Sequence, residues 1–205
     1  MVFRRVFGAA VSLCLFSGLL AAPASADDRA SMPLGNPTLQ PFGHRDFCLQ
    51  HKAECQPTDE VSAQPVALDL TLKLLVAQVN TEVNSAIAPE ADQKQYGTEE
   101  HWDYPTSQRG DCEDYALEKR RRLHEAGVPL GDLLMTVVRK PDGTGHAVLT
   151  LRTRSGDFVL DNLDWRVRPW TQVGYRFIKR QQSENPGRWV SIERDEEPLV
   201  SAVEK

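Results

Sequence analysis

Apolar side chains recur every three or four residues between positions 65 and 87, in the stretch PVALDLTLKLLVAQVNTEVNSAI. This spacing is typical of an amphipathic α-helix, and Pro65 suits the first turn of a helix. The repeating apolar positions are Leu68, Leu72, Leu75, Val79 and Val83. We therefore expect a helix over 65–87 that packs against the core and has no chemistry of its own.

A second helix is predicted from Cys112 to about Ala126. Asp111 is a favourable N-cap residue, and Asp114 follows it by three positions, as in an approximate capping box. Gly127 suits the position after the last turn, because glycine adopts a left-handed conformation without strain. The cysteine in RGDCEDYALEKRR therefore stands at a helix N-terminus.

Two other stretches show neither a helical nor a strand period. Residues 27–43 contain three prolines and two glycines, which predicts an irregular N-terminal arm. Residues 88–110 are polar and are broken by prolines and a glycine. We expect a loop there that exposes Trp102 and Tyr104.

The period changes to two after the second helix. Apolar positions alternate within 133–140, 146–154 and 157–163, which are separated by PDGTG and by a turn near Ser155-Gly156. The segments YRFIKRQQ and RWVSIE predict a final hairpin around SENPG. Helices thus precede an antiparallel sheet, and this order predicts an α+β fold.

The first 26 residues have the three parts of a secretory signal peptide. Arginines within Met1–Arg5 precede an apolar run over Val6–Leu20, and APASA then offers small residues at Ala24 and Ala26 for cleavage. The run is short for a transmembrane helix, although an uncleaved membrane anchor is the alternative. We expect cleavage after Ala26 and a single domain over 27–205.

The charge balance excludes one class of partner. The chain has a formal net charge of −5, and loss of a segment with two arginines and no acidic residue lowers it to −7. An acidic protein is repelled by the phosphate backbone, so we expect no nucleic-acid partner.

Three cysteines remain after removal of the signal segment, namely Cys48, Cys55 and Cys112. Disulfides persist in the oxidising compartment to which a signal peptide leads. Cys48 and Cys55 are seven residues apart, a spacing that a small loop can close. We expect a Cys48–Cys55 disulfide, with two unpaired thiols as the alternative. Cys112 is then left as a free thiol. A free thiol in a secreted protein needs a functional reason.

Catalysis would give Cys112 that reason. A cysteine nucleophile needs a base, and the base needs a partner that orients it. His146 opens one predicted strand and Asp161 lies on the next. The Cys112 helix could pack on the same face of these strands, together with Val148 and Val159. Its N-terminal dipole would lower the pKa of the thiol.

The turn between the two strands decides whether the histidine and the aspartate meet. A turn centred on residues 153–154 would set His146 directly opposite Asp161, whereas a tight turn at 155–156 would set Asp161 opposite Thr150. The triad hypothesis therefore requires a wider or bulged turn. Taken singly, the cysteine, the histidine and the aspartate each have an ordinary explanation, as a core residue, a surface group and a turn residue.

Several motifs resemble one family, the bacterial transglutaminase-like cysteine proteinases. They are GDCEDYA at 110–116, GHAVLTL at 145–151, LDN at 160–162, FGHRDFC…EC, and VNTEVN…YGTEEHWDYP, so the likeness covers nearly all of the mature chain. The resemblance implies a papain-like, transglutaminase-like core with a triad at Cys112, His146 and Asp161. The best-understood relatives are periplasmic proteases that clip large surface adhesins and release biofilm cells, which implies a protein substrate of that kind and a periplasmic location.

The resemblance also implies two further sites. Relatives bind calcium beside the cysteine through acids that match Asp111 and Glu113, and Ca²⁺ would neutralise these charges next to the thiol. The alternative is that the acids only stabilise the start of the helix. A tryptophan at the position of Trp102 resembles an anchor that docks into an inner-membrane receptor, and an exposed tryptophan would suit such a contact. The alternative is packing against the helix.

We therefore expect a periplasmic cysteine endopeptidase. Cys112 would attack the scissile carbonyl, His146 would act as base and then as acid, and Asp161 would orient His146. One alternative is a transglutaminase-type acyl transferase or amidase, because the same acyl-enzyme serves either acceptor. The other is a catalytically inactive, calcium-dependent binding module.

Overall fold

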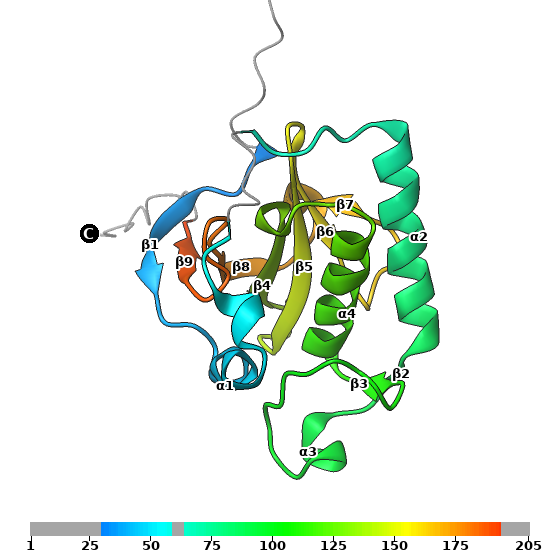
Figure 1. Ribbon diagram of the computed structural model, residues 1–205, viewed down its shortest axis with the longest axis vertical. Coiled ribbons are helices and arrows are strands. Elements are labelled where there is room, and N and C mark those ends of the chain that lie inside the picture. The colour runs from blue at the N-terminus through cyan, green and yellow to red at the C-terminus, as the bar shows by residue number, and fades with distance from the viewer. Residues whose placement is uncertain (1–29, 59–63, 194–205) are drawn as a thin grey trace, which may run out of the picture.

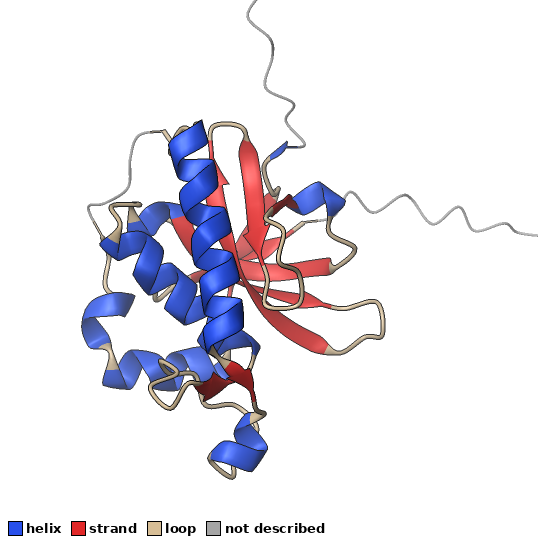
Figure 2. Cartoon of the chain, turned by 90° about the vertical axis from the view of Figure 1, so that its right-hand side faces the viewer, coloured by secondary structure: helices blue, strands red, loops and turns tan. Residues whose placement is uncertain are grey.

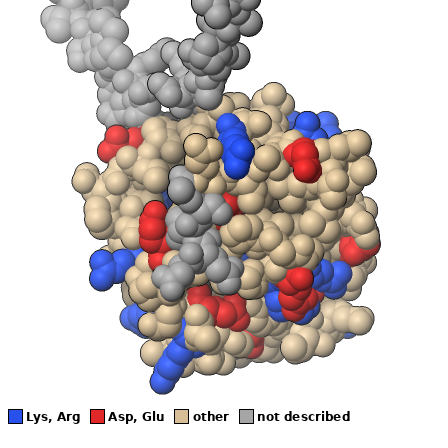
Figure 3. Space-filling view, turned by 45° about the horizontal axis from the view of Figure 1, so that its top comes forward, with Lys and Arg blue, Asp and Glu red and all other residues tan. Residues whose placement is uncertain are grey.

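The computed structural model describes residues 30–58 and 64–193 (Figure 1). The signal peptide expected over 1–26 lies outside these residues. No helix within the described ranges is both long and apolar enough to cross a lipid bilayer. On the face shown in Figure 3, acidic and basic side chains are interspersed among wide uncharged areas. This face therefore offers no continuous basic surface to a nucleic acid.

A seven-stranded sheet forms the centre of the molecule, in the order β1-β9-β8-β4-β5-β6-β7. Each pairing in it is antiparallel. The strands are β1 (Leu34–Thr38), β4 (Leu133–Arg139), β5 (Gly145–Thr153), β6 (Gly156–Leu160), β7 (Arg168–Pro169), β8 (Arg176–Gln181) and β9 (Trp189–Ile192). The short strands β2 (Ala88–Pro89) and β3 (Arg109–Gly110) form a separate parallel pair. The α+β prediction is confirmed, including the final hairpin β8–β9.

The two long helices lie together on one side of the sheet (Figure 2). α4 contacts β5 and β4, and α2 contacts α4. The helices are α1 (Phe42–Gln50), α2 (Leu70–Ala86), α3 (Asp92–Gln95) and α4 (Cys112–Glu125), with 3₁₀ turns at Lys52–Cys55, Leu130–Asp132 and Trp170–Gln172. The helix predicted from Cys112 is confirmed, with Asp111 at its N-cap and Gly127 at a φ of 94° after its end.

The predicted start of the first long helix is wrong by five residues. α2 begins at Leu70, and the carboxylate of Asp69 caps it by accepting a hydrogen bond from the Leu72 N–H at 2.8 Å. Upstream of it, Val66 forms a parallel β-bridge with Thr153 at the end of β5. Helical propensity therefore yields to pairing with a distant strand, which no local pattern reveals.

The N-terminal arm is also more regular than the sequence predicts. Residues Leu34–Thr38 form the edge strand β1, which pairs with β9, and α1 follows it directly. A register shift between Leu34 and Pro37 accommodates the proline. Proline is tolerated on an edge strand because the outer N–H groups there have no ladder partner. The proline-rich composition therefore marked an edge strand and not an irregular arm.

The sheet is buried on both faces. One core contains the apolar side chains of α4 and of the strand residues Leu149, Leu151 and Leu160. Val148 and Val159 belong to a second cluster on the opposite face. The expected packing of the Cys112 helix with Val148 and Val159 is therefore wrong. Apolar residues occupy both faces of β5, so alternation could not assign the helix to one of them.

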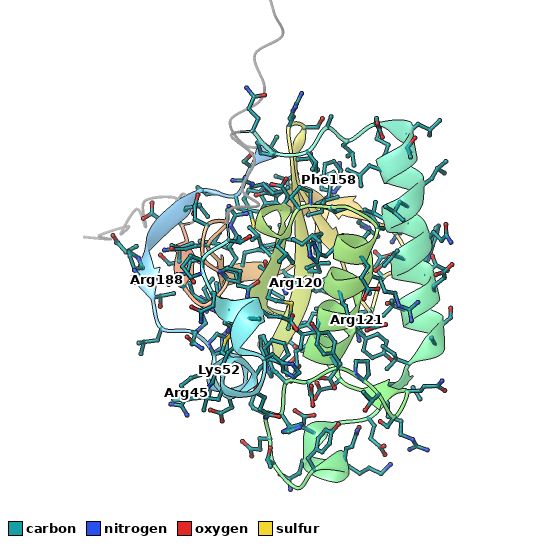
Figure 4. The ribbon with its side chains drawn as sticks, in the orientation of Figure 1. Arg45, Lys52, Arg120, Arg121, Phe158 and Arg188 are labelled. Carbon is teal, nitrogen blue, oxygen red and sulfur yellow. A yellow bond between two sulfur atoms is a disulfide. The ribbon has the colours of Figure 1, made fainter. Side chains whose placement is uncertain are left out.

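The predicted disulfide is present between Cys48 and Cys55, and Cys112 is the free cysteine of the described residues. The bridge joins α1 to the following 3₁₀ turn. Arg120 of α4, labelled in Figure 4, donates hydrogen bonds to the Glu54 carboxylate and to the Leu133 carbonyl, each at 3.2 Å. The disulfide segment is thereby tied to α4 and to the sheet.

Candidate active site

Cys112 is the first residue of α4, and its sulfur lies against the start of β5. The Ala147 N–H donates a hydrogen bond to the sulfur at 3.3 Å, and Ala147 directly follows His146. Figure 1 shows the first turn of α4, the start of β5 and the end of α2 at the same lower end of the molecule. The thiol is thus at a helix N-terminus, beside the strand that carries the predicted base.

His146 and Asp161 form a buried hydrogen-bonded pair. His146 Nε2 lies 2.8 Å from Asp161 Oδ1, and each side chain is only 4% exposed. Burial opposes ionisation of the Asp161 carboxyl, but the hydrogen bond from His146 and its charge hold the pKa of that carboxyl below its usual range. Because Nε2 faces the carboxylate, Nδ1 is the ring nitrogen left for a proton from another group.

The hairpin that brings this pair together differs from both predicted registers. Thr153 pairs with Gly156, so residues 154–155 form a tight turn, and Gly156 has a φ of 108°. Asp161 follows the last residue of β6 and contacts His146 diagonally instead of from the directly opposite position. The expectation that the triad requires a wider or bulged turn is therefore wrong. Diagonal neighbours on one face of a strand pair lie within reach of long side chains.

The acids around the cysteine oppose its ionisation. The thiol lies 3.1 Å from Glu113 Oε2. Burial raises the pKa of the Cys112 thiol well above its usual range, and the Glu113 carboxylate raises it further. Burial and the adjacent Asp111 carboxylate likewise raise the pKa of Glu113. The site as it stands therefore favours a neutral thiol, and only a positive charge near these acids could reverse that preference.

Three aspartates meet at the start of α4, beside the residue that carries the thiol. Oxygens of Asp92, Asp111 and Asp114 lie within 4.8 Å of one another. Burial, with repulsion from Asp111, raises the pKa of Asp92 to about 6 and that of Asp114 to about 8. Asp92 Oδ1 and Asp111 Oδ1 are buried and have no hydrogen-bond partner within the described ranges. Carboxylate oxygens are among the ligands that Ca²⁺ prefers.

A family profile identifies the chain on independent grounds. The profile described as bacterial transglutaminase-like cysteine proteinase (BTLCP) matches residues 34–197. The chain belongs to this family. It is accordingly a cysteine peptidase of the transglutaminase-like superfamily. No curated protein sequence matches it significantly.

Solved structures agree with this BTLCP fold. The chain is similar to Legionella pneumophila LapG in its calcium-bound form, with 22% identity, a TM-score of 0.51, and coverage of 78% of this chain and 86% of that chain. The EGTA-treated form of the same protein also has 22% identity and a TM-score of 0.51, with coverage of 76% and 81%. At this identity the likeness supports the shared fold.

Sequence reasoning missed two residues of this BTLCP site. Asp92 opens the short helix α3 and joins Asp111 and Asp114 only through the fold. Tyr175 donates its hydroxyl proton to Asp161 Oδ2 at 2.7 Å from the loop before β8. Neither has a local motif that marks it. Asp114 was expected as a capping-box residue, and it is also part of the aspartate cluster.

The expected exposure of Trp102 is wrong. Its side chain is only 4% exposed and packs against His44 and Trp189. A Cβ at Gly43 would lie 2.2 Å from the indole, so α1 closes directly over the ring. Trp102 is therefore not an exposed anchor, and the most exposed aromatic residues among those described are Phe42 and Trp165, at 75% and 71%.

Proposed function

We propose that Cys112, His146 and Asp161 form the catalytic triad of this cysteine peptidase. The hydrogen-bonded His146–Asp161 pair carries the proposal, because it leaves Nδ1 available at the start of the strand against which the Cys112 sulfur rests. A nucleophile, a base and an orienting carboxylate then come from three separate segments of the chain.

The chemistry follows from these positions. His146 takes the thiol proton, and the Cys112 sulfur adds to the scissile carbonyl carbon. The imidazolium then gives its proton to the leaving amine as the peptide C–N bond breaks, and a thioester remains on Cys112. Water, deprotonated by His146, attacks the thioester and releases the acid product and the free thiol. The Cys112 N–H at the helix start is the proposed oxyanion donor.

A calcium ion is proposed beside the triad. The cluster of Asp92, Asp111 and Asp114 fits it, because two buried carboxylate oxygens in this cluster lack partners among the described residues. Burial, and to a smaller extent the charge of Asp111, raise the pKa values of Asp92 and Asp114. When bound, the ion would supply the positive charge that offsets these acids next to the thiol. Glu113 lies on the thiol side of Asp111, so its carboxylate could complete the ligand set.

The proposed substrate is a surface or secreted protein such as an adhesin, and the proposed location is the periplasm. Membership in the BTLCP family supports a protein substrate, and the signal-like N-terminus supports export. Docking to an inner-membrane receptor stays a proposal, and the buried Trp102 does not support it.

Substrate trapping tests the proposal. The Cys112→Ala variant, exposed to total periplasmic and outer-membrane protein in calcium buffer, should retain a protein that the wild type cleaves. Mass spectrometry of the wild-type products should show new N-termini, whereas cross-linked lysines would indicate acyl transfer. A thiol probe that labels Cys112 no faster than it labels a denatured control would indicate a binding module without catalysis.

A further inference from the structure

The Asp161 carboxylate has a donor on each oxygen. Oδ1 accepts hydrogen bonds from His146 Nε2 at 2.8 Å and from the Leu163 N–H at 3.0 Å, and Oδ2 accepts one from the Tyr175 hydroxyl at 2.7 Å. The Tyr175 ring also packs edge-on against the imidazole, with centroids 5.5 Å apart and an interplanar angle of 81°. One tyrosine therefore contacts both members of the histidine–aspartate pair.

The main chain of Asp161 is held from the other side by α2. Asn84 Nδ2 donates to the Asp161 carbonyl at 2.8 Å. One helical turn earlier, Asn80 Nδ2 donates to the carbonyls of Asp164 and Trp165, each at 3.0 Å. Residues four apart share a face of a helix, so both amides point at the same loop.

This loop needs such support because the sheet does not extend to it. β6 ends at Leu160, so Asp161 lies beyond the last hydrogen-bonded pair of the ladder. Leu163 and Trp165 in the same loop are 59% and 71% exposed, so their burial does not anchor it. The direction of the His146 ring depends on its hydrogen bond to Asp161, so a displacement of the carboxylate would change the direction in which Nδ1 points.

We propose that Tyr175 and Asn84 are positioning residues that hold Asp161 from two sides. Tyr175 fixes the carboxylate, and Asn84 fixes the main chain that carries it. Neither touches the reacting atoms. Their effect on the nucleophile passes through Asp161 and then His146, so the inference rests on the proposed triad.

The test measures the alkylation rate of Cys112 by iodoacetamide in calcium buffer at about pH 6 and about pH 10, where the thiolate depends respectively on the imidazole and on bulk base. Tyr175→Phe keeps the ring and removes one hydroxyl. We expect an alkylation rate about tenfold lower at pH 6 and unchanged at pH 10, because a hydrogen bond to a charged group of the pair is lost. Partial unfolding would instead raise both rates.

Tyr104→Phe is the matched control, since Tyr104 also donates its hydroxyl to a carboxylate, that of Glu54. It should leave both rates at the wild-type values. Asn84→Ala gives a second, independent variant and should show the same selective loss at pH 6.

The outcomes separate the inference from the triad on which it rests. If His146→Ala leaves the wild-type pH profile unchanged, the triad itself is refuted. If His146→Ala abolishes the reactivity at pH 6 while Tyr175→Phe and Asn84→Ala behave like Tyr104→Phe, the triad stands and the positioning role is overturned. Selective loss in His146→Ala and in both variants supports it.

Discussion

Asp161 and Asp92 are both buried carboxylates, with 3% and 1% of their residue surface exposed. Asp161 receives hydrogen bonds from His146, Leu163 and Tyr175, and its pKa lies below its usual range. Asp92 receives a hydrogen bond on one oxygen only and faces Asp111, and its pKa is raised to about 6. Both carboxylates are buried, but both oxygens of Asp161 accept hydrogen bonds, whereas one oxygen of Asp92 has no partner among the described residues; we call the Asp92 side of the site frustrated for this reason.

The two carboxylates differ in the hydrogen-bond donors that the fold places around them. The side of the site around Asp161 is complete, because its donors come from β5, from its own loop and from the segment before β8. The aspartate cluster at the start of α4 is incomplete, because three carboxylates lie together and two of their buried oxygens have no partner among the described residues. Buried like charges cost free energy unless a cation joins them. We infer that the first half of the site is preformed and that the second half awaits an ion.

The largest expected effect comes from breaking the complete half. Asp161→Ala and His146→Ala should each lower the rate of substrate cleavage about 10⁴-fold or more, as removal of triad members does elsewhere. The double variant should be hardly worse than either single one, because the residues act as a unit. Steady-state cleavage of the trapped substrate measures all three rates. Losses that multiply would mean that the two residues act separately.

The preformed half could be found in the sequence more readily than the other. Cys112 opens a helix, His146 lies near the start of one strand, and Asp161 follows the end of the next, and the periods of these elements are visible in the sequence. The odd number of cysteines in the mature chain identifies the thiol that is left unpaired. Asp92 and Tyr175 could not be found, because they join the site through pairings such as β2 with β3 and β8 with β4 that connect distant segments. The prediction for Trp102 was wrong because its neighbours in the sequence are polar, whereas the residue that covers its ring belongs to α1, a distant segment of the chain.

A second prediction concerns Lys119, a buried base near the complete half. Burial lowers the pKa of Lys119 to about 7, and the charge of Asp161 only partly opposes this. The unfolded chain keeps this proton up to pH 10.5, so stability rises between about pH 7 and 10.5 and the full cost of the buried charge applies below pH 7. Lys119→Met should therefore raise the free energy of unfolding by about 4 to 5 kcal/mol at pH 6 and hardly change it near pH 10.5.

Urea denaturation at the two pH values measures this difference. Lys73→Met, at an exposed position of α2, is the control and should change stability little at either pH. An equal gain at both pH values would show that the effect is apolar packing and not relief of a buried charge.

A third prediction completes the frustrated half. Calcium should raise the melting temperature of the chelator-treated protein. At a calcium concentration a hundred times the dissociation constant, the folded state should be stabilised by about 2.7 kcal/mol. Magnesium should stabilise it poorly, because magnesium demands tighter octahedral geometry. Asp111→Asn should weaken calcium binding about tenfold, since it removes a charged ligand. Asparagine caps a helix as well as aspartate does, so the helix itself should be preserved.

Asp69→Asn provides the matched control, because Asp69 is the N-cap of α2 and lies outside the aspartate cluster. Its calcium affinity should equal that of the wild type in calorimetric titration. Absence of binding heat at millimolar calcium in the wild type would leave Asp111 and Glu113 as helix-start residues only.

The smallest effect is expected from Asn80→Ala. This change removes both amide bonds to the loop beyond Asp161, but it also removes the buried Asn80 Oδ1, which has no partner in the part of the chain that the structure describes. The loss and the relief partly offset one another, so we expect a destabilisation of about 1 kcal/mol. Cys112 alkylation should keep its wild-type pH profile, since Asn84 still holds the Asp161 carbonyl. Gln78→Ala, on the exposed side of α2, controls for the change in helix composition. If Asn80→Ala instead shifted the alkylation profile as strongly as Asn84→Ala, the whole loop, and not the direct contacts of Asp161, would set the geometry of the preformed half.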